Sequence, residues 1–226
     1  MKKIILTGSE GLFGKVLQKT LSNEETTVVC IDQDLGFDLT NEKSVIEIMK
    51  AHSDAEYLVN LFAINHHIEK GKDSPTLFDI SLDSLNDYCN VNLIALFSVC
   101  RSFAKHCNAK SIVNFSSLYG IRSPKKFLYD SGEKHIGYTM TKHGVIGLSQ
   151  HLAAHISPVR VNCLVPGGVE TPNQSSEFKD AYCKNVPLGK MMKAEQSTGL
   201  VKLLCSEDSN YMTGSVITID GGWTSW

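Results

Sequence analysis

The sequence lacks the features that mark membrane proteins and nucleic-acid-binding proteins. Its 226 residues contain no apolar run near the roughly 18 residues that a membrane helix needs. The apolar run after Lys2 and Lys3 is too short for a signal peptide. A net charge of −2 gives no electrostatic basis for binding nucleic acid or an anionic membrane. We therefore expect a cytoplasmic protein that acts on a small molecule, with neither nucleic acid nor a membrane as partner.

A disulfide pattern and a metal-binding motif are also missing. The seven cysteines are odd in number and scattered, and no two form a C-x-x-C pair. Such cysteines are typical of free thiols in a reducing compartment. His151 and His155 stand four residues apart, but the acidic residue that a zinc-protease motif places between them is absent. We expect no metal site.

Apolar, β-rich runs alternate with helical patterns along the whole chain. The runs predict strands over residues 3–6, 27–31, 57–62, 110–115, 159–165 and 215–219. The periodic patterns predict a helix from about residue 12 and others over about 41–52, 84–107, 138–156 and 195–205. This alternation without a linker predicts one Rossmann-type α/β domain over 1–226, with a doubly wound parallel sheet of about seven strands. Two polar segments, 119–137 and 172–194, are candidate substrate loops.

A glycine turn, Thr7 to Gly14, lies between the first strand and the first helix. Glycines let the backbone approach a pyrophosphate, and the helix N-terminus supplies free N–H groups and a positive dipole end. Asp32 ends the second strand, where an acidic residue is placed to bind the adenosine ribose hydroxyls. Gln33 follows it and Glu10 precedes Gly11, so no cation is available for a 2′-phosphate. The sequence predicts NAD(H) in preference to NADP(H).

Tyr138 and Lys142 stand four residues apart, on one face of a predicted helix. A free phenol has a pKa near ~10, and a cation one turn away favours the phenolate and lowers that pKa. Ser117 follows the strand over 110–115, at the sheet edge where ligands bind in open α/β folds. This arrangement predicts an acid/base pair, although a half-exposed tyrosine beside a solvated lysine has the same spacing.

Two further motifs, Pro166-Gly167 and Asp220-Gly221-Gly222, lie near the C-terminus. In this order, the motifs resemble those of the short-chain dehydrogenases/reductases, and the resemblance covers essentially the whole chain. The resemblance implies four catalytic residues: Asn92, Ser117, Tyr138 and Lys142. It implies the following cofactor contacts: Gly8, Glu10, Gly11, Leu12, Phe13, Gly14, Asp32, Asp38, Leu39, Asn60, Phe62, Tyr138, Lys142, Pro166, Gly167, Val169 and Thr171. In this set, the Val169 backbone and Thr171 would hold the nicotinamide carboxamide.

The chain departs from the family pattern in three places. The glycine spacing is TGxxGxxG instead of the usual TGxxxGxG, and Asn60 to Ala63 replaces the family's N-N-A-G. Phe62 thus places a ring where the family has a small residue. Ser117 and Tyr138 are 21 residues apart, which enlarges the loop between them.

The expected activity is the NAD(H)-dependent interconversion of an alcohol and a carbonyl. Residues 116–168 are most similar to oxidoreductases of bacterial surface-sugar and flagellin-glycan (nonulosonate) biosynthesis. The candidate substrate contacts are Ser117, Arg122, Lys126 and Tyr138, and the two loops also carry the cations Lys125, Lys134, Lys190 and Lys193. Cations around one pocket would favour an anionic sugar-type substrate, although solvated loop charges are the alternative. A non-catalytic dinucleotide-binding regulator and a nucleotide-sugar epimerase or dehydratase are the alternatives. The family's habit of pairing through its long helices implies a homodimer or homotetramer.

Overall fold

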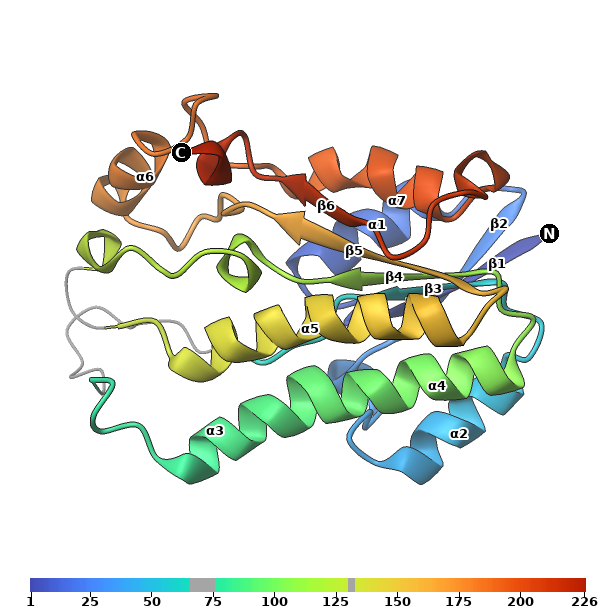
Figure 1. Ribbon diagram of the computed structural model, residues 1–226. Coiled ribbons are helices and arrows are strands. Elements are labelled where there is room, and N and C mark those ends of the chain that lie inside the picture. Colours follow the sequence, from blue (N-terminus) through green and yellow to red (C-terminus); the bar gives the residue numbers. More distant parts are fainter. Residues whose placement is uncertain (66–75, 130–132) are drawn as a thin grey trace.

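The computed structural model describes residues 1–65, 76–129 and 133–226. Its centre is a sheet of six strands in the order β2-β1-β3-β4-β5-β6 (Figure 1). The strands are β1 (Lys2–Thr7), β2 (Thr26–Ile31), β3 (Tyr57–Asn60), β4 (Ser111–Phe115), β5 (Arg160–Pro166) and β6 (Val216–Ile219). All neighbouring strands pair in parallel. The expected Rossmann-type α/β fold is confirmed.

The described part of the sheet has six strands instead of about seven. Residues 32–41 connect β2 to helix α2 (Glu42–Ala51), and they contain one short 3-10 turn at Gln33–Leu35. A crossover to a further parallel strand takes a dozen or more residues. This connection is therefore too short to hold both a helix and a strand before α2.

Helices cover both faces of the sheet (Figure 1). They are α1 (Leu12–Leu21), α2 (Glu42–Ala51), α3 (Leu82–Cys89), α4 (Leu96–His106), α5 (Ile136–His155), α6 (Ser176–Cys183) and α7 (Thr198–Leu204). Val45, Val99 and Val145 bring α2, α4 and α5 into one buried cluster, and Leu17 and Val201 bring α1 and α7 into another. The central strands β4 and β5 are buried along their whole length, as strands covered on both faces must be.

Two expected helices differ from the sequence reading. The helix expected over 84–107 consists of α3, a π-helical turn at Asn90–Ala95, and α4. Helix α5 begins at Ile136, two residues earlier than expected. The reason is that the His135 side chain caps it, because its Nδ1 accepts the Gly137 N–H at 3.0 Å.

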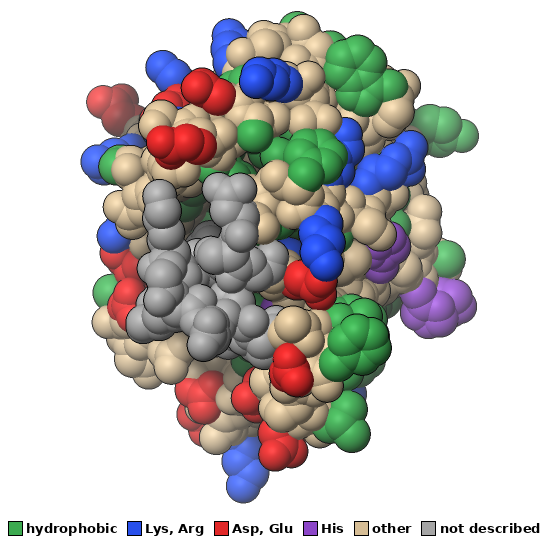
Figure 2. Space-filling view, turned by 90° about the vertical axis from the view of Figure 1, so that its left-hand side faces the viewer, with side chains coloured by type: hydrophobic (Ala, Val, Ile, Leu, Met, Phe, Trp, Pro, Cys, Tyr) green, Lys and Arg blue, Asp and Glu red, His purple; other side chains and the backbone are tan. Residues whose placement is uncertain are grey.

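A third buried cluster lies where the strands end. It joins Leu118 and Leu128 from the loop after β4 to Tyr182 of α6 and to Trp223 near the C-terminus. The rings of Tyr182 and Trp223 stack at 4.4 Å. Figure 2 looks onto this end of the molecule, and acidic and basic side chains are interspersed around the part that is not described. The segment 172–194, expected as a substrate loop, is not a loop throughout, because helix α6 (Ser176–Cys183) forms part of it.

Three further expectations bear on the chain as a whole. All seven cysteines are free thiols, as expected. Within the described ranges, no helix is long and apolar enough to cross a membrane. Across the same residues, no three His, Cys, Asp or Glu side chains are grouped so that they could hold a metal ion.

Candidate active site

Ser117 and Tyr138 meet at the carboxyl edge of the sheet. Ser117 lies just after β4, Tyr138 lies in the first turn of α5, and the Ser117 side chain is near enough to the Tyr138 phenol to lower its pKa. The Ser117 oxygen also accepts the Tyr119 N–H at 3.2 Å. Behind them, the Ser116 hydroxyl donates to the Lys142 carbonyl at 2.7 Å, which fixes α5 against the end of β4. The fold thus brings together two hydroxyl groups separated by a long loop.

The pKa of Tyr138 is raised. Burial of the phenol is the largest cause, and the hydrogen bond from Ser117 counteracts it in part. The sequence-based expectation of a pKa lowered by Lys142 is therefore wrong for this arrangement. Lys142 Nζ lies 5.7 Å from the centre of the Tyr138 ring and donates to the Phe115 carbonyl at 2.9 Å.

Lys142 is itself a perturbed group. It is 5% exposed, and burial lowers its pKa to about 8. At neutral pH it still carries most of its charge, at one turn from Tyr138 and beside the carboxyl end of β4. A cation in this position can bind hydroxyl groups of a ligand that reaches the sheet edge.

Asn92 is the centre of the π-helical turn between α3 and α4. Its amide oxygen accepts the Ile64 N–H at 2.9 Å, and its amide nitrogen donates to the Ile64 carbonyl at 3.2 Å and to the Thr141 hydroxyl at 3.1 Å. Such π-turns are frequent at functional sites. Here the side chain braces the segment after β3 against the residue next to Lys142, and its role in catalysis stays a prediction.

The glycine turn is packed so closely that two of its glycines leave no room for a side chain. Gly8 has φ +71°, and a Cβ there would lie 2.5 Å from the Phe62 nitrogen; a Cβ on Gly14 would lie 2.3 Å from the Gly8 carbonyl oxygen. Gly11 caps α1 without any side-chain hydrogen bond. The N-terminus of α1 is therefore closely packed but not capped by a side chain. Its first N–H groups are suited to bind a pyrophosphate.

Asp32 lies beside this turn, at the end of β2. Its two carboxylate oxygens accept the Glu10 N–H at 2.9 Å and the Asp34 N–H at 3.0 Å. Further on, Asp38 accepts the N–H and hydroxyl of Thr40, and these bonds lower its pKa. Of the acidic side chains that the sequence assigned to the adenosine end, Asp32 is thus held by two backbone N–H groups and Asp38 by Thr40.

Two residues assigned to the cofactor have mainly structural contacts. Asn60 is 3% exposed, accepts the Thr7 hydroxyl at 2.8 Å and donates to Asn114 at 2.8 Å, and Asn114 donates on to Ser149. The side chain of Asn60 is therefore part of a buried polar chain from β1 to α5. Phe62 packs against the main core cluster, which accommodates the ring that replaces the family's small residue.

The segment after β5 already holds a carboxamide. Gln174 accepts the Thr171 N–H at 2.9 Å through its side-chain oxygen, and donates to the Val169 carbonyl at 3.0 Å. Val169 and Thr171 are the residues that the family resemblance assigns to the nicotinamide carboxamide. The Thr171 N–H and the Val169 carbonyl therefore match the acceptor and the donor of a carboxamide. In this structure the Gln174 side chain takes both of these backbone groups. Close to them, Gly167 approaches Asp220 so tightly that a Cβ would lie 2.9 Å from its Cα.

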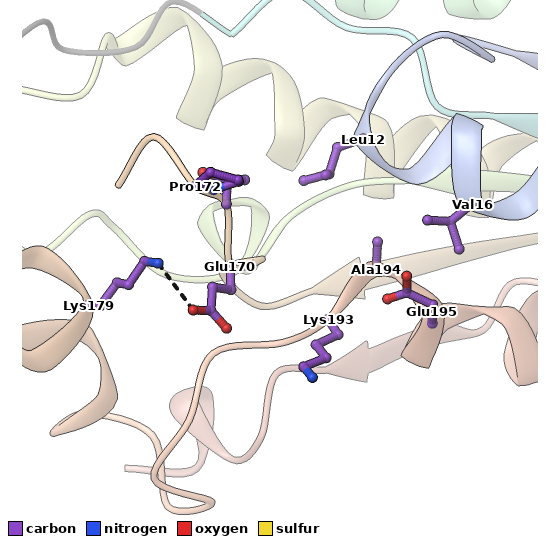
Figure 3. A pocket seen from close by; sticks show the side chains of 9 residues that line it. Leu12, Val16, Glu170, Pro172, Lys179, Lys193, Ala194 and Glu195 are labelled. Carbon is purple, nitrogen blue, oxygen red and sulfur yellow. Dashed lines mark hydrogen bonds and ion pairs between the residues drawn. The ribbon is translucent and has the colours of Figure 1, made fainter. Parts of the chain in front are cut away.

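A cavity of about 380 Å³ opens between the start of α1 and the segment after β5 (Figure 3). Its lining consists of Leu12, Val16, Glu170, Thr171, Pro172, Lys179, Lys193, Ala194 and Glu195. Lys179 is paired with Glu170 at 3.1 Å. Leu12 and Thr171 are predicted cofactor contacts, whereas Ser117 and Tyr138 do not line the cavity. It therefore flanks the cofactor side of the site and not the hydroxyl pair.

The two loop cations assigned to the substrate have other partners. Arg122 donates to the Ile121 and Thr224 carbonyls, and Lys126 pairs with Glu133 at 2.9 Å while 83% of its side chain is exposed. The cation that does reach the site is Lys134, whose Nζ lies 5.0 Å from the centre of the Tyr138 ring. Lys134 is one of the loop cations that the sequence already placed over the substrate side.

Sequence analysis also missed a group of tyrosines next to Tyr138. The hydroxyl groups of Tyr119 and Tyr129 are hydrogen bonded at 2.7 Å, and Tyr182 accepts the Gly168 N–H. Burial raises the pKa of Tyr129 to about 12 and that of Tyr182 well above its usual value, so these phenols stay neutral. The part of the site next to Tyr138 therefore contains neutral hydroxyl groups carried by aromatic rings.

Comparisons with known proteins agree with this architecture. The family model described as Enoyl-(Acyl carrier protein) reductase matches residues 4–224. The 3-oxoacyl-(acyl-carrier-protein) reductase FabG of Aquifex aeolicus is 29% identical over 228 residues, which are 97% of this chain and 86% of that protein. The protein of the same name from Chlamydia trachomatis is 30% identical over 155 residues, 65% of this chain and 59% of that protein. A short-chain dehydrogenase from Leptospira borgpetersenii, solved with bound NAD+, is 29% identical with a TM-score of 0.85, covering 99% of this chain and 92% of that one.

The fold and the site define a dinucleotide-dependent α/β oxidoreductase. The sheet is parallel throughout, and the glycine turn after β1 and the Ser117–Tyr138 pair after β4 both lie where its strands end. The chain belongs to the short-chain dehydrogenase/reductase family, whose fold binds NAD(P).

Proposed function

We propose that the protein interconverts a secondary alcohol and a ketone on a small, polar, sugar-type substrate, with NAD(H) as its hydride carrier. The observation that carries this proposal is that the fold places the Ser117 side chain beside the Tyr138 phenol, with Lys142 one turn further along α5. A substrate oxygen placed beside both hydroxyls would be polarised by one and protonated by the other. The bound nicotinamide supplies the hydride.

The raised pKa of Tyr138 keeps the phenol protonated at neutral pH, which is the form that reduction of a carbonyl needs. A phenol that keeps its proton at neutral pH is ready to donate it to the oxygen of a carbonyl that is being reduced. Ser117 holds the phenol in place and can hydrogen bond the same oxygen. Lys142, whose Nζ lies near the ring, would bind the nicotinamide ribose and hold positive charge beside the phenol as the proton leaves.

The preference for NAD(H) rests on charge. Asp32 is held at the end of β2 by two backbone N–H groups, and Glu10 and Asp34 are its immediate neighbours. The cation Lys15 approaches Glu10 at 3.9 Å and is therefore drawn to that carboxylate. A 2′-phosphate beside these carboxylates would be repelled, whereas two ribose hydroxyls would be accepted.

Two substrate classes remain to be compared. The tyrosine hydroxyls beside Tyr138 support a small hydroxylated substrate, such as the sugar derivatives expected from the sequence. The likeness to the Aquifex aeolicus 3-oxoacyl-(acyl-carrier-protein) reductase supports a second candidate, the reduction of a 3-oxoacyl thioester. The loop after β4, α6 and the C-terminal residues pack into one aromatic cluster, which favours the compact substrate over a long acyl chain.

The test follows reduced-nicotinamide absorbance with NADH or NADPH and a panel of keto sugars, sugar acids and 3-oxoacyl thioesters. Tyr138→Phe keeps the ring and deletes the proton, so turnover should fall by at least ~10²-fold with NADH affinity little changed. Full turnover in this variant would refute the mechanism. Faster reduction of the thioesters than of every polar ketone would favour the second candidate.

A further inference from the structure

The chain after β3 crosses the edge of the sheet between the glycine turn and α5. On one side, a Cβ on Gly8 would lie 2.5 Å from the Phe62 nitrogen, so the two backbones are in close contact. On the other side, the Asn92 amide bonds the N–H and the carbonyl of Ile64 at 2.9 and 3.2 Å. Asn65 is the next residue, and it therefore follows a segment that is fixed on both sides of the site.

This segment is also tied to the turn that carries Tyr138. The Asn92 amide nitrogen donates to the Thr141 hydroxyl at 3.1 Å, and that hydroxyl lies 2.6 Å from the Gly137 carbonyl and 3.2 Å from the Tyr138 carbonyl. Strand β3 pairs with β1 on one side and with β4 on the other, so the segment leaves the sheet between the strands that lead to the glycine turn and to Ser117. A substrate that reacts between a dinucleotide and Tyr138 would therefore lie beside this segment.

Asn65 has a buried hydrogen-bond acceptor without a donor. Its Oδ1 is shielded from solvent and has no hydrogen-bond partner among the residues that the structure describes. A buried amide oxygen without a donor costs free energy, and nearly all such oxygens in folded proteins are bonded. A donor from a ligand would satisfy this oxygen.

We propose that Asn65 is a specificity-determining residue whose Oδ1 accepts a hydrogen bond from a hydroxyl group near the reacting carbonyl of the substrate, so that hydroxyketones are the preferred substrates. This inference rests on the proposed function, because it places that hydroxyl close to the oxygen that Tyr138 protonates. An amide oxygen only accepts hydrogen bonds, so it distinguishes a hydroxyl from an ether or a methyl group. Lys142, whose Nζ lies 5.7 Å from the Tyr138 ring centre, repels a substrate ammonium, which leaves a neutral hydroxyl as the donor.

Three variants separate recognition from folding. Asn65→Leu keeps a side chain of similar shape and deletes the acceptor, whereas Asn65→Asp keeps an acceptor oxygen in the same place. Ser98→Ala is the control, because it removes another buried oxygen without a partner in the described chain, from helix α4. The midpoint of thermal unfolding should not fall in Asn65→Leu, since no bond to Oδ1 is lost. A fall of more than roughly 5 °C would assign Asn65 to the fold and overturn the inference.

The kinetic test uses NADH and a panel of hydroxyketones, with the hydroxyl one to three carbons from the ketone. Each is paired with its methyl ether, which cannot donate, and with its deoxy analogue, which is smaller. The wild type should show a kcat/KM about ten-fold higher for the best hydroxyketone than for either analogue, the size of one hydrogen bond. Asn65→Leu should raise KM for the hydroxyketone about ten-fold and change KM for the deoxy ketone less than about two-fold.

The other two variants should keep the preference of the wild type for the hydroxyl. Equal kcat/KM of the wild type for the hydroxyketone and its deoxy analogue would contradict the role of Asn65, and so would an unchanged preference in Asn65→Leu. Loss of the preference in Ser98→Ala as well would show that it does not depend on Asn65, with the same consequence.

A binding measurement separates this inference from the proposed function. The NADH complex of the 15N-labelled protein is titrated with the diol that corresponds to the best hydroxyketone, or with sorbitol if none is turned over. The side-chain amide signal of Asn65, identified by its absence from the spectrum of Asn65→Asp, should shift on titration. If no ketone is reduced, the proposed function fails, and the shift or constancy of this signal still decides whether Asn65 binds a hydroxyl. If ketones are reduced without a preference for the hydroxyl and the signal stays in place, the inference fails and the proposed function stands.

Discussion

Replacing Lys142 by methionine should stabilise the protein at neutral pH while it abolishes turnover. Burial lowers the Lys142 pKa from 10.5 to about 8. A base whose pKa is lower in the folded state binds its proton more tightly in the unfolded chain, so the charged form favours unfolding. Stability should therefore rise with pH between about 8 and 10.5 in the wild type.

The magnitude follows from the two pKa values. At about 1.4 kcal/mol per pH unit, the difference between 10.5 and about 8 corresponds to about 3 kcal/mol of destabilisation below pH 8. Lys142→Met also removes the donor to the Phe115 carbonyl, which costs about 1 kcal/mol. The net expectation is a variant that is more stable by about 2 kcal/mol at pH 7.

Urea unfolding at pH 7, 8, 9 and 10 checks this expectation. The advantage of Lys142→Met should persist up to about pH 8 and fall to near zero by about pH 10, because the folded-state lysine is then neutral and the remaining penalty of about 1 kcal/mol is offset by the hydrogen bond that the variant lacks. Lys126→Met is the control, since its lysine is exposed and its substitution should leave stability nearly unchanged at every pH. A Lys142→Met protein that is less stable than the wild type at pH 7, by an amount independent of pH, would refute the reasoning.

Three further predictions concern the cofactor and the assembly. Asp32→Ala should narrow the preference for NAD(H) over NADP(H) by removing the nearest repulsion to a 2′-phosphate; equal wild-type affinity for both, measured by fluorescence quenching, would contradict the argument. Gln174→Ala should tighten NADH binding several-fold if the Gln174 carboxamide competes for Val169 and Thr171; weaker binding would show instead that Gln174 supports the loop. Ile94 is 61% exposed and Phe97 is 40% exposed on the helical segment that the sequence assigns to assembly. The wild type should therefore be a dimer or tetramer by light scattering at micromolar concentration, and Phe97→Glu should shift it toward the monomer.

The direction of the Tyr138 pKa shift shows a limit of local reasoning. Sequence spacing places a cation one turn from the phenol, which by itself lowers a phenol's pKa. In the folded protein, burial of the phenol is the larger effect, and Lys142 is hydrogen bonded to the Phe115 carbonyl. Desolvation depends on everything that packs around a group, so it cannot be read from two residues four apart.

The sequence by itself determined the features that depend on neighbours in the chain. The alternation of strands and helices, the glycine turn from Gly8 to Gly14, and Asp32 at the end of β2 are local patterns, and the structure has them in the expected places. The spacing of Tyr138 and Lys142 likewise put both on α5. Such features depend on the periodicity and backbone geometry of residues close in the sequence, so they can be predicted without knowing which distant segments pack together.

Only the tertiary structure decided which side chains meet. It directed Arg122 to the C-terminal segment, Asn60 into a buried polar chain, and Gln174 onto the backbone after β5. It also brought Lys134, instead of Arg122 or Lys126, to the Tyr138 ring. Each of these outcomes depends on the competition among partners from distant segments for the same donors and acceptors, and burial and geometry settle that competition only when the segments have packed.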